Sequence, residues 1–288
     1  MVWSFERIAG PYGGLVDALA WDGQGLLFSV LPQDALLRFQ PDTGQVSVFR
    51  PYWTRIRGLA LDGSGVLYGA QAGSRRIVRF NADGSAAPIR ARLDGLFHNC
   101  PEALVIDRAG RIWFSDPYDT VMPRGPDLFP LLDHASVLRL ERDGGSGAWH
   151  LRRMTFDTRY PRAVALSRDE RTLYVVDSPL EGQGEVRAYP VQDDGALGAG
   201  RRVYEAPEGG LDGLCLDAQD NLIVCAADVR VISPDGRLLE SHAAPDGRPA
   251  ACAFGGPDLF VSTQEGHLYR VRNTRGDANP PKPGSLDC

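Results

Sequence analysis

The chain has 288 residues, of which 43% are hydrophobic and 24% are charged, a balance typical of a globular protein with enough apolar material for a core. Its formal net charge of −6 gives no electrostatic support to binding of nucleic acid or of an anionic membrane. No apolar run is long enough to span a bilayer, and the N-terminus lacks the basic and apolar regions of a signal peptide. The expected partner is therefore a small-molecule substrate.

The five cysteines form no close CxxC pair: Cys100, Cys215, Cys225, Cys252 and Cys288. Three of them, Cys215, Cys225 and Cys252, stand in apolar strand-like runs and are expected to behave as small buried hydrophobic residues. A reducing cytoplasm is the simplest location for such a chain. The sequence does not fix an oligomeric state.

The chain begins with a short strand-like segment, Trp3–Ile8, and then repeats one pattern. Six segments each contain a short apolar run, a polar turn rich in Asp and Gly, and a second apolar run. They begin at Val16, Ile56, Pro101, Pro161, Leu211 and Pro249. This is a β-hairpin written six times, with glycine supplying the positive φ that a tight turn needs.

Most copies are followed by a third strand-like phrase, such as ALLRFQPDTG, RIVRFNADG or SVLRLERDG. Parallel αβ folds would need helical periodicity between the strands, and a β-sandwich would not demand six copies of one phrase. The repeats predict an all-β, six-bladed β-propeller with four-stranded blades. Trp3–Ile8 is expected to supply the outer strand of blade six, residues 1–272 to form one domain, and residues 273–288 to be a disordered tail.

One position in the repeats is charged in five of six copies. It holds Asp17, Arg57, Glu102, Arg162, Asp212 and Ala250. In a propeller the innermost strand of each blade begins beside the central axis, so these side chains are expected to meet at one mouth of the pore. Charges gathered in a partly dehydrated funnel must be paired or must bind something. Cross-pore ion pairs, Asp17–Arg162 and Arg57–Asp212, would give the ring a purely structural role.

Several of the same phrases resemble the gluconolactonase and regucalcin-like family, and the resemblance covers nearly the whole chain. The phrases are HNCPEALVIDRAGRIWFSDPYD, YPRAVALSRDERTLYVVDS, GLDGLCLDAQDNLIV, CAFGGPDLFVST and, in blade two, QAGSRRIVRF. Strictosidine synthase-like proteins share the fold, so a relative of that branch stays possible.

This resemblance implies a divalent cation, usually calcium, bound at the pore mouth by oxygen ligands. The family's ligand positions fall on Asp17, Glu102, Arg162 and Asp212, so Asp17, Glu102 and Asp212 are the expected metal ligands. Arg162 cannot be a ligand, which leaves two readings open. The carboxylates bind a weakened metal site, or Arg162 stands in its place as a permanent cation and no metal is bound.

The resemblance also suggests further pocket residues. The family's substrate-binding arginine in blade three is replaced by Cys100, which is grouped with Arg57, Asn99, Tyr118 and Asp119 as expected substrate-binding residues. His98 is a candidate acid or base near neutral pH, or alternatively a plain loop histidine. The longest insertion, Thr120–Ser136, is expected either to cover the mouth as a lid or to pack on a blade edge.

No serine nucleophile elbow, HExxH motif, P-loop or dinucleotide fingerprint is present. The leading hypothesis is hydrolysis of a lactone or related ester. Water activated by metal or carboxylate would attack the carbonyl, with Glu102 or Asp212 as base and Arg162 stabilising the oxyanion. The alternatives are a metal-free isomerase, lyase or cyclase in which Glu102 and Asp17 shuttle protons, and a non-catalytic binding propeller.

Overall fold

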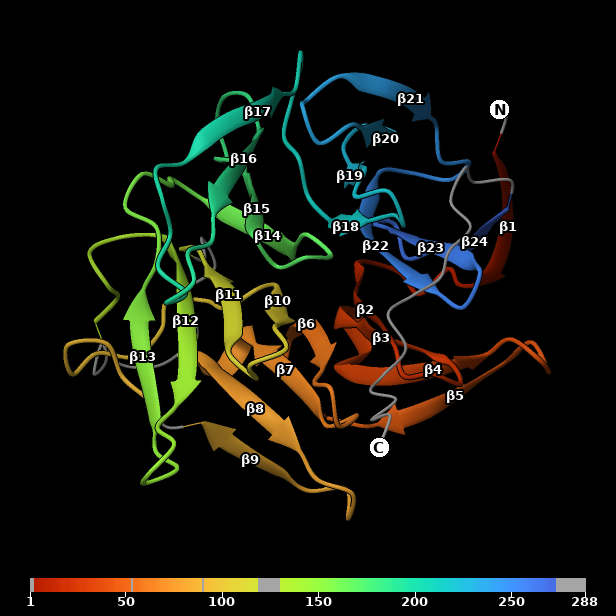
Figure 1. The fold of residues 1–288 in the computed structure, drawn as a ribbon. Coiled ribbons are helices and arrows are strands. Elements are labelled where there is room, and N and C mark those ends of the chain that lie inside the picture. Colours follow the sequence, from red (N-terminus) through yellow and green to blue (C-terminus); the bar gives the residue numbers. More distant parts are fainter. Residues whose placement is uncertain (1–2, 53, 90, 119–129, 273–288) are drawn as a thin grey trace, which may run out of the picture.

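We describe residues 3–52, 54–89, 91–118 and 130–272 of a computed structural model of the chain. They form six four-stranded antiparallel sheets arranged around a central axis (Figure 1). Apart from two short 3-10 turns, η1 (Leu31–Gln33) and η2 (Ala72–Ser74), these ranges hold only strands and loops. None of the described helices is long and apolar enough to cross a membrane. The predicted six-bladed β-propeller is confirmed.

Each blade runs from an inner strand at the axis to an outer strand at the rim. The inner strands are β2 (Val16–Trp21), β6 (Ile56–Leu61), β10 (Leu104–Ile106), β14 (Pro161–Leu166), β18 (Leu214–Leu216) and β22 (Pro249–Gly255). The second strands are β3 (Leu26–Val30), β7 (Leu67–Gln71), β11 (Ile112–Asp116), β15 (Thr172–Asp177), β19 (Leu222–Cys225) and β23 (Asp258–Thr263). The third strands are β4 (Ala35–Gln40), β8 (Arg76–Phe80), β12 (Ser136–Arg142), β16 (Glu185–Pro190), β20 (Val229–Ile232) and β24 (Leu268–Arg272).

The outer strands complete the ring and close it. They are β5 (Gln45–Arg50), β9 (Ala86–Ile89), β13 (Trp149–Arg153), β17 (Arg201–Glu205), β21 (Leu238–His242) and, in blade six, β1 (Ser4–Ala9). Strand β1 pairs with β24, so the N-terminal segment is the outer strand of the last blade, as predicted. The predicted tail, residues 273–288, lies outside the described residues.

In four of the six blades the turn between the first two strands is held by an aspartate at its opening position. The Oδ1 atom of Asp62 accepts the backbone N–H groups of Ser64 and Val66, at 2.9 and 3.0 Å. Asp217 does the same for Gln219 and Asn221, both at 2.8 Å. An aspartate carboxylate that binds backbone two residues on is the chemistry of an Asx turn, which explains the Asp-rich turns of the repeat.

The hydrophobic core is divided among the six interfaces between neighbouring blades. Each interface holds its own cluster of buried side chains. Trp113 of β11, which is fully buried, packs with Val164 and Val175 of blade four in one of them. Cys225 and Cys252 are buried in the cluster between blades five and six, and Cys215 is half-buried against it. Since every blade packs on both neighbours, the inner strands are held in a fixed ring.

Two glycines let inner strands approach each other at the mouth of the pore. A Cβ atom on Gly58 of β6 would lie 2.3 Å from the carbonyl oxygen of Glu102, and one on Gly213 would lie 2.7 Å from that of Ala250. The Gly213 N–H donates to the same Ala250 oxygen at 2.8 Å. Only a residue without a Cβ permits this contact. The charged residues before these glycines, Arg57 and Asp212, are therefore drawn toward the next blade.

Candidate active site

A cavity of about 310 Å³ lies where the inner strands begin, and all six blades contribute to its lining. The six residues at the repeated charged position all line it: Asp17, Arg57, Glu102, Arg162, Asp212 and Ala250. The cavity is therefore the mouth of the pore, and the repeat position locates it.

Irregular strand pairing shapes this mouth. The β2/β3 register shifts between Asp17 and Ala20, and the β14/β15 register shifts between Pro161 and Ala163, on either side of Arg162. A β-bulge bends the strand and re-aims a side chain, and bulges are common beside active sites. In blades three and five the inner strands are only three residues long and begin after Glu102 and Asp212. The mouth residues thus stand at the irregular start of each inner strand.

Arg57 joins two carboxylates on the neighbouring blades. Its Nε atom lies 3.0 Å from Asp17 Oδ2, and one of its terminal nitrogens lies 3.2 Å from Glu102 Oε1. All three side chains are at most 17% exposed. The two carboxylates raise the pKa of Arg57 against the opposing effect of burial, so the guanidinium stays charged.

A second cluster forms on the opposite side of the mouth. The Nη1 atom of Arg162 donates to Asp212 Oδ1 at 2.9 Å. The other oxygen of Asp212 accepts from Gln264 Nε2 at 3.1 Å and lies 3.5 Å from a terminal nitrogen of Arg248. The two cross-pore ion pairs suggested by the sequence, Asp17–Arg162 and Arg57–Asp212, are wrong. The pairs form between adjacent blades because the converging inner strands bring neighbouring side chains closest.

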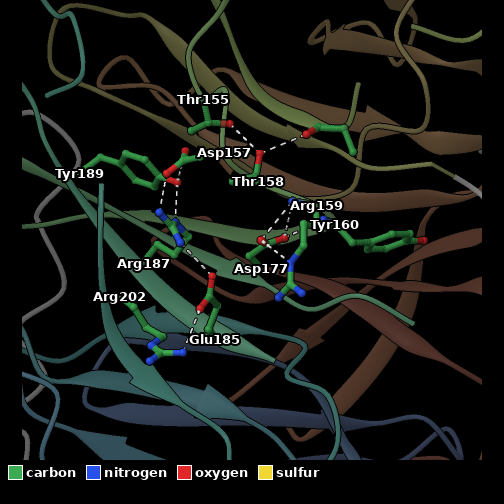
Figure 2. A network of polar contacts seen from close by, with 11 residues as sticks. Thr155, Asp157, Thr158, Arg159, Tyr160, Asp177, Glu185, Arg187, Tyr189 and Arg202 are labelled. Atoms are coloured by element: carbon green, nitrogen blue, oxygen red, sulfur yellow. Dashed lines mark hydrogen bonds and ion pairs between the residues drawn. The ribbon is translucent and has the colours of Figure 1, made fainter. Parts of the chain in front are cut away.

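The loop before β14 is held firmly and sets the position of Arg162. The buried carboxylate of Asp177 accepts the backbone N–H groups of Arg159, at 3.0 Å, and Tyr160, at 2.6 Å (Figure 2). In the same loop Thr155 and Thr158 bond each other through their hydroxyl groups at 2.8 Å. The guanidinium of Arg162 lies 5.1 Å from the centre of the Tyr160 ring. Burial of Asp177 raises its pKa, while the two N–H bonds act in the opposite direction.

Asp116 performs the same task in blade three. Its carboxylate accepts the N–H groups of Asn99 at 2.8 Å and Cys100 at 2.9 Å, just before Glu102. Burial raises the pKa of Asp116 to about 7. Asp116 and Asp177 close the second strands of consecutive blades, so one device positions a charged mouth residue in each. The sequence reasoning gave neither aspartate a role, although the aligned phrases IWFSD and LYVVD place them together.

The surroundings of Asp17 disturb its ionisation. Burial raises its pKa to about 6, the nearby Glu102 and Asp212 carboxylates act in the same direction, and Arg57 partly opposes them. The next residue, Ala18, has a φ of +55°, and its N–H bonds the Asp17 carboxylate. A left-handed alanine costs roughly 1–2 kcal/mol. Strain of this kind persists where the surrounding structure fixes it, often at a functional site.

The remaining candidates lie beside the mouth and not in its lining. His98 is buried with its ring edge-on to Phe114, 5.1 Å between centroids, and burial lowers its pKa to about 4. The amide of Asn99 accepts from the Leu132 N–H and donates to the His134 carbonyl, both at 2.8 Å, and so anchors the end of the long insertion. Among the residues described, neither side chain reaches the cavity.

The remaining expected substrate-binding residues are Cys100, Tyr118 and Asp119, and the long insertion is the expected lid. Cys100 is buried and is not part of the lining. Tyr118 is half-buried, with a pKa raised by burial, and is not part of the lining. Asp119 and most of the proposed lid, residues 120–129, lie outside the described residues.

The mouth residues do not fit a divalent cation. Asp17 and Glu102 are both bound by Arg57, and Asp212 is bound by Arg162, Gln264 and Arg248. A hard cation such as calcium takes six to eight oxygen ligands, whereas here guanidinium groups hold the carboxylates. Within the described ranges, no group of three or more His, Cys, Asp or Glu side chains is arranged to hold a metal ion.

Fold and site together define a class: a six-bladed propeller whose pore mouth is lined by buried, paired charges. Residues 15–265 match the family described as the SMP-30/gluconolactonase/LRE-like region. The chain therefore belongs to the SMP-30/gluconolactonase/LRE-like family.

Individual relatives agree with this assignment. The chain is 26% identical over 277 residues to a gluconolactonase of Zymomonas mobilis, covering 87% of this chain and 76% of that protein. It is 37% identical over 106 residues to regucalcin of Danio rerio, covering 34% of this chain and 35% of that protein. Among solved structures, a gluconolactonase of Xanthomonas campestris superimposes with a TM-score of 0.83 at 30% identity, covering 93% of this chain and 89% of that one.

Proposed function

We propose that the protein hydrolyses a lactone or a closely related ester at the pore mouth. Support comes from the family and from the gluconolactonases among its relatives. The cavity, about 310 Å³, is of a size suited to a small cyclic ester such as a sugar lactone. The observation that carries the proposal is that Asp17, with its raised pKa, and Arg162 line the same cavity.

In this mechanism Asp17 is the general base. A carboxylate with a pKa near 6 is a stronger base than an ordinary one and is mostly ionised at neutral pH. It takes a proton from water as the water oxygen bonds to the lactone carbonyl carbon. Both oxygens of Asp212 are already bound by other side chains, so Asp17 is a better base than Asp212.

Arg162 supplies the positive charge for the developing oxyanion. Its Nη1 atom is bound to Asp212, and the guanidinium is 22% exposed at the cavity. A fixed cation facing the carbonyl oxygen stabilises the tetrahedral intermediate. When that intermediate collapses, the carbonyl carbon releases the ring oxygen, which takes the proton from Asp17. The product is an open-chain hydroxy acid, and Asp17 is ionised again.

Arg57 and Glu102 orient the base. Arg57 forms ion pairs with both Asp17 and Glu102, so Glu102 helps to hold the guanidinium beside the Asp17 carboxylate. Asp212 does the same for Arg162 from blade five. The two groups that touch substrate are therefore each held by an ion pair with a neighbouring blade.

A panel of five- and six-membered lactones tests the proposal. Acid release would be followed with a pH indicator for the wild type, Asp17→Asn and Arg162→Ala. We expect kcat/KM of the wild type to rise with pH through about 6, as Asp17 loses its proton. Both substitutions should lower it by at least about a hundredfold. Turnover that is equal in the wild type and Asp17→Asn would contradict the mechanism, and no turnover of any lactone would contradict the function.

A further inference from the structure

The three carboxylates of the mouth share one property. Each forms an ion pair with a guanidinium group of the chain itself. Arg57 reaches Asp17 and Glu102 at 3.0 and 3.2 Å, and Arg162 reaches Asp212 at 2.9 Å.

The guanidinium groups of Arg57 and Arg162 belong to the same ring of six repeated positions as the carboxylates. Arg57 and Arg162 stand at the same repeated position as the carboxylates, on β6 and β14. They are therefore built into the mouth on rigid inner strands, as the acids are. Their side chains are 17% and 22% exposed, so they lie largely within the funnel.

We propose that Arg57 and Arg162 are the resident cations of the pore mouth and that the site works without a divalent metal ion. Two positive charges offset the three carboxylates, and Arg248, beside Asp212, adds a third. Arginine remains protonated at all relevant pH values, and its planar fork suits carboxylates. The negative charge of the three carboxylates is thus balanced by arginine side chains of the protein itself. For catalysis this inference rests on the proposed function, but its binding test does not.

Calcium titration measures this directly. We would compare the wild type, Arg162→Asn and Arg57→Gln by isothermal titration calorimetry after treatment with chelator, with circular dichroism as the check on folding. Arg202→Asn is the matched control, because Arg202 on the outer strand β17 is 52% exposed, pairs with Glu185 and Glu205, and is not part of the cavity lining.

The proposal predicts that removing a mouth guanidinium creates a cation site. Arg162→Asn exchanges a cation for an amide oxygen ligand beside Asp212, so its affinity for calcium should be at least about tenfold higher than that of the wild type. Arg57→Gln frees Asp17 and Glu102 and should act in the same direction, whereas Arg202→Asn should match the wild type. Arg162→Asn and Arg57→Gln test the proposal separately. If one variant fails to fold, the calcium affinity of the other still decides the outcome.

Two results would overturn the proposal. The first is saturable binding of one equivalent of calcium to the wild type with affinity equal to that of the folded mouth variants. The second is failure of every folded mouth variant to bind calcium more tightly than the wild type.

Activity in chelator gives a separate readout. Lactone turnover by the wild type should be unchanged by EDTA, and turnover lost in EDTA and restored by calcium would also overturn the proposal. Absence of lactone turnover in either condition would reject the proposed function, while the calcium titration would still decide the role of the arginines.

Discussion

Replacing Asp17 by asparagine should stabilise the protein while removing its proposed base. In the unfolded chain this carboxyl ionises near its ordinary pKa of 3.8, whereas burial in the mouth raises the pKa to about 6. Because the folded pKa is the higher one, the native state binds the proton more tightly than the unfolded chain. Ionisation of Asp17 therefore lowers the free energy of unfolding as the pH rises from about 3.8 to about 6, and the loss remains above that range.

The size of this effect follows from the two pKa values. At 1.36 kcal/mol for each pH unit between them, ionised Asp17 costs about 3 kcal/mol at pH 8 and about half of that at pH 5. Asparagine keeps the shape and carries no charge, so Asp17→Asn should be more stable than the wild type, by about 1.5 kcal/mol more at pH 8 than at pH 5. The lost ion pair with Arg57 reduces the gain, but Arg57 keeps its contact with Glu102.

Urea denaturation at pH 5 and pH 8 measures both the difference in unfolding free energy between Asp17→Asn and the wild type and the change of that difference with pH. Groups such as Asp116, whose pKa is also raised, titrate in both proteins and cancel in the comparison. Asp193→Asn is the control, because Asp193 is 96% exposed in a surface pair and should change little at either pH. If Asp17→Asn is less stable than the wild type at both pH values, or if the difference does not depend on pH, the reasoning about this carboxylate is refuted.

Three further substitutions test how the fold supports the mouth. Asp177→Ala leaves two backbone N–H groups without their acceptor and should cost about 2 kcal/mol in urea denaturation; it should also lower kcat through Arg162, and unchanged kcat would refute the positioning role. Gly213→Ala forces a Cβ to 2.7 Å from a carbonyl oxygen and should cost about 1–3 kcal/mol, whereas Gly63→Ala meets nothing within 4 Å and should stay within about 0.5 kcal/mol of wild type; equal effects would contradict the close approach. Trp113→Ala empties a fully buried site and should cost about 3–5 kcal/mol in the same assay; a loss below 1 kcal/mol would argue against the tight blade interface.

The fold could be predicted from the sequence because a propeller of this type repeats one structural unit, the blade, six times along the chain. Turn aspartates such as Asp62 and Asp217 recur at one position, and so do the charged residues that line the cavity. Repetition makes positions comparable without any alignment to other proteins. The closing strand was also predictable, because one strand-like segment precedes the first complete repeat and the last repeat lacks a fourth strand.

The pairing of the charges could not be predicted, because the repeat fixes where a side chain starts and not where its end lies. An arginine reaches several neighbours, and the pairing of Arg57 with both Asp17 and Glu102 depends on how three consecutive blades pack around the pore. Gln264 and Arg248 bind Asp212 from outside the repeated position. No spacing in the sequence indicates that Gln264 and Arg248 lie beside Asp212.

The roles of Asp116 and Asp177 in holding the loops at the mouth could not be predicted from the sequence either. Asp116 and Asp177 end apolar strands and look like ordinary turn residues. Only the folded chain shows that each accepts backbone N–H groups from the preceding interblade loop. Their matching place in two aligned phrases was the available signal.

Our main hypothesis is that carboxylate and guanidinium groups of this mouth hydrolyse a lactone. Its most direct test is the value of kcat/KM for a six-carbon sugar lactone, measured in EDTA at pH 7.5 for the wild type and for Asp17→Asn. We expect turnover by the wild type and a loss of at least about a hundredfold in kcat/KM of the folded variant. Equal rates in the two proteins, or no turnover by the wild type until calcium is added, would contradict it.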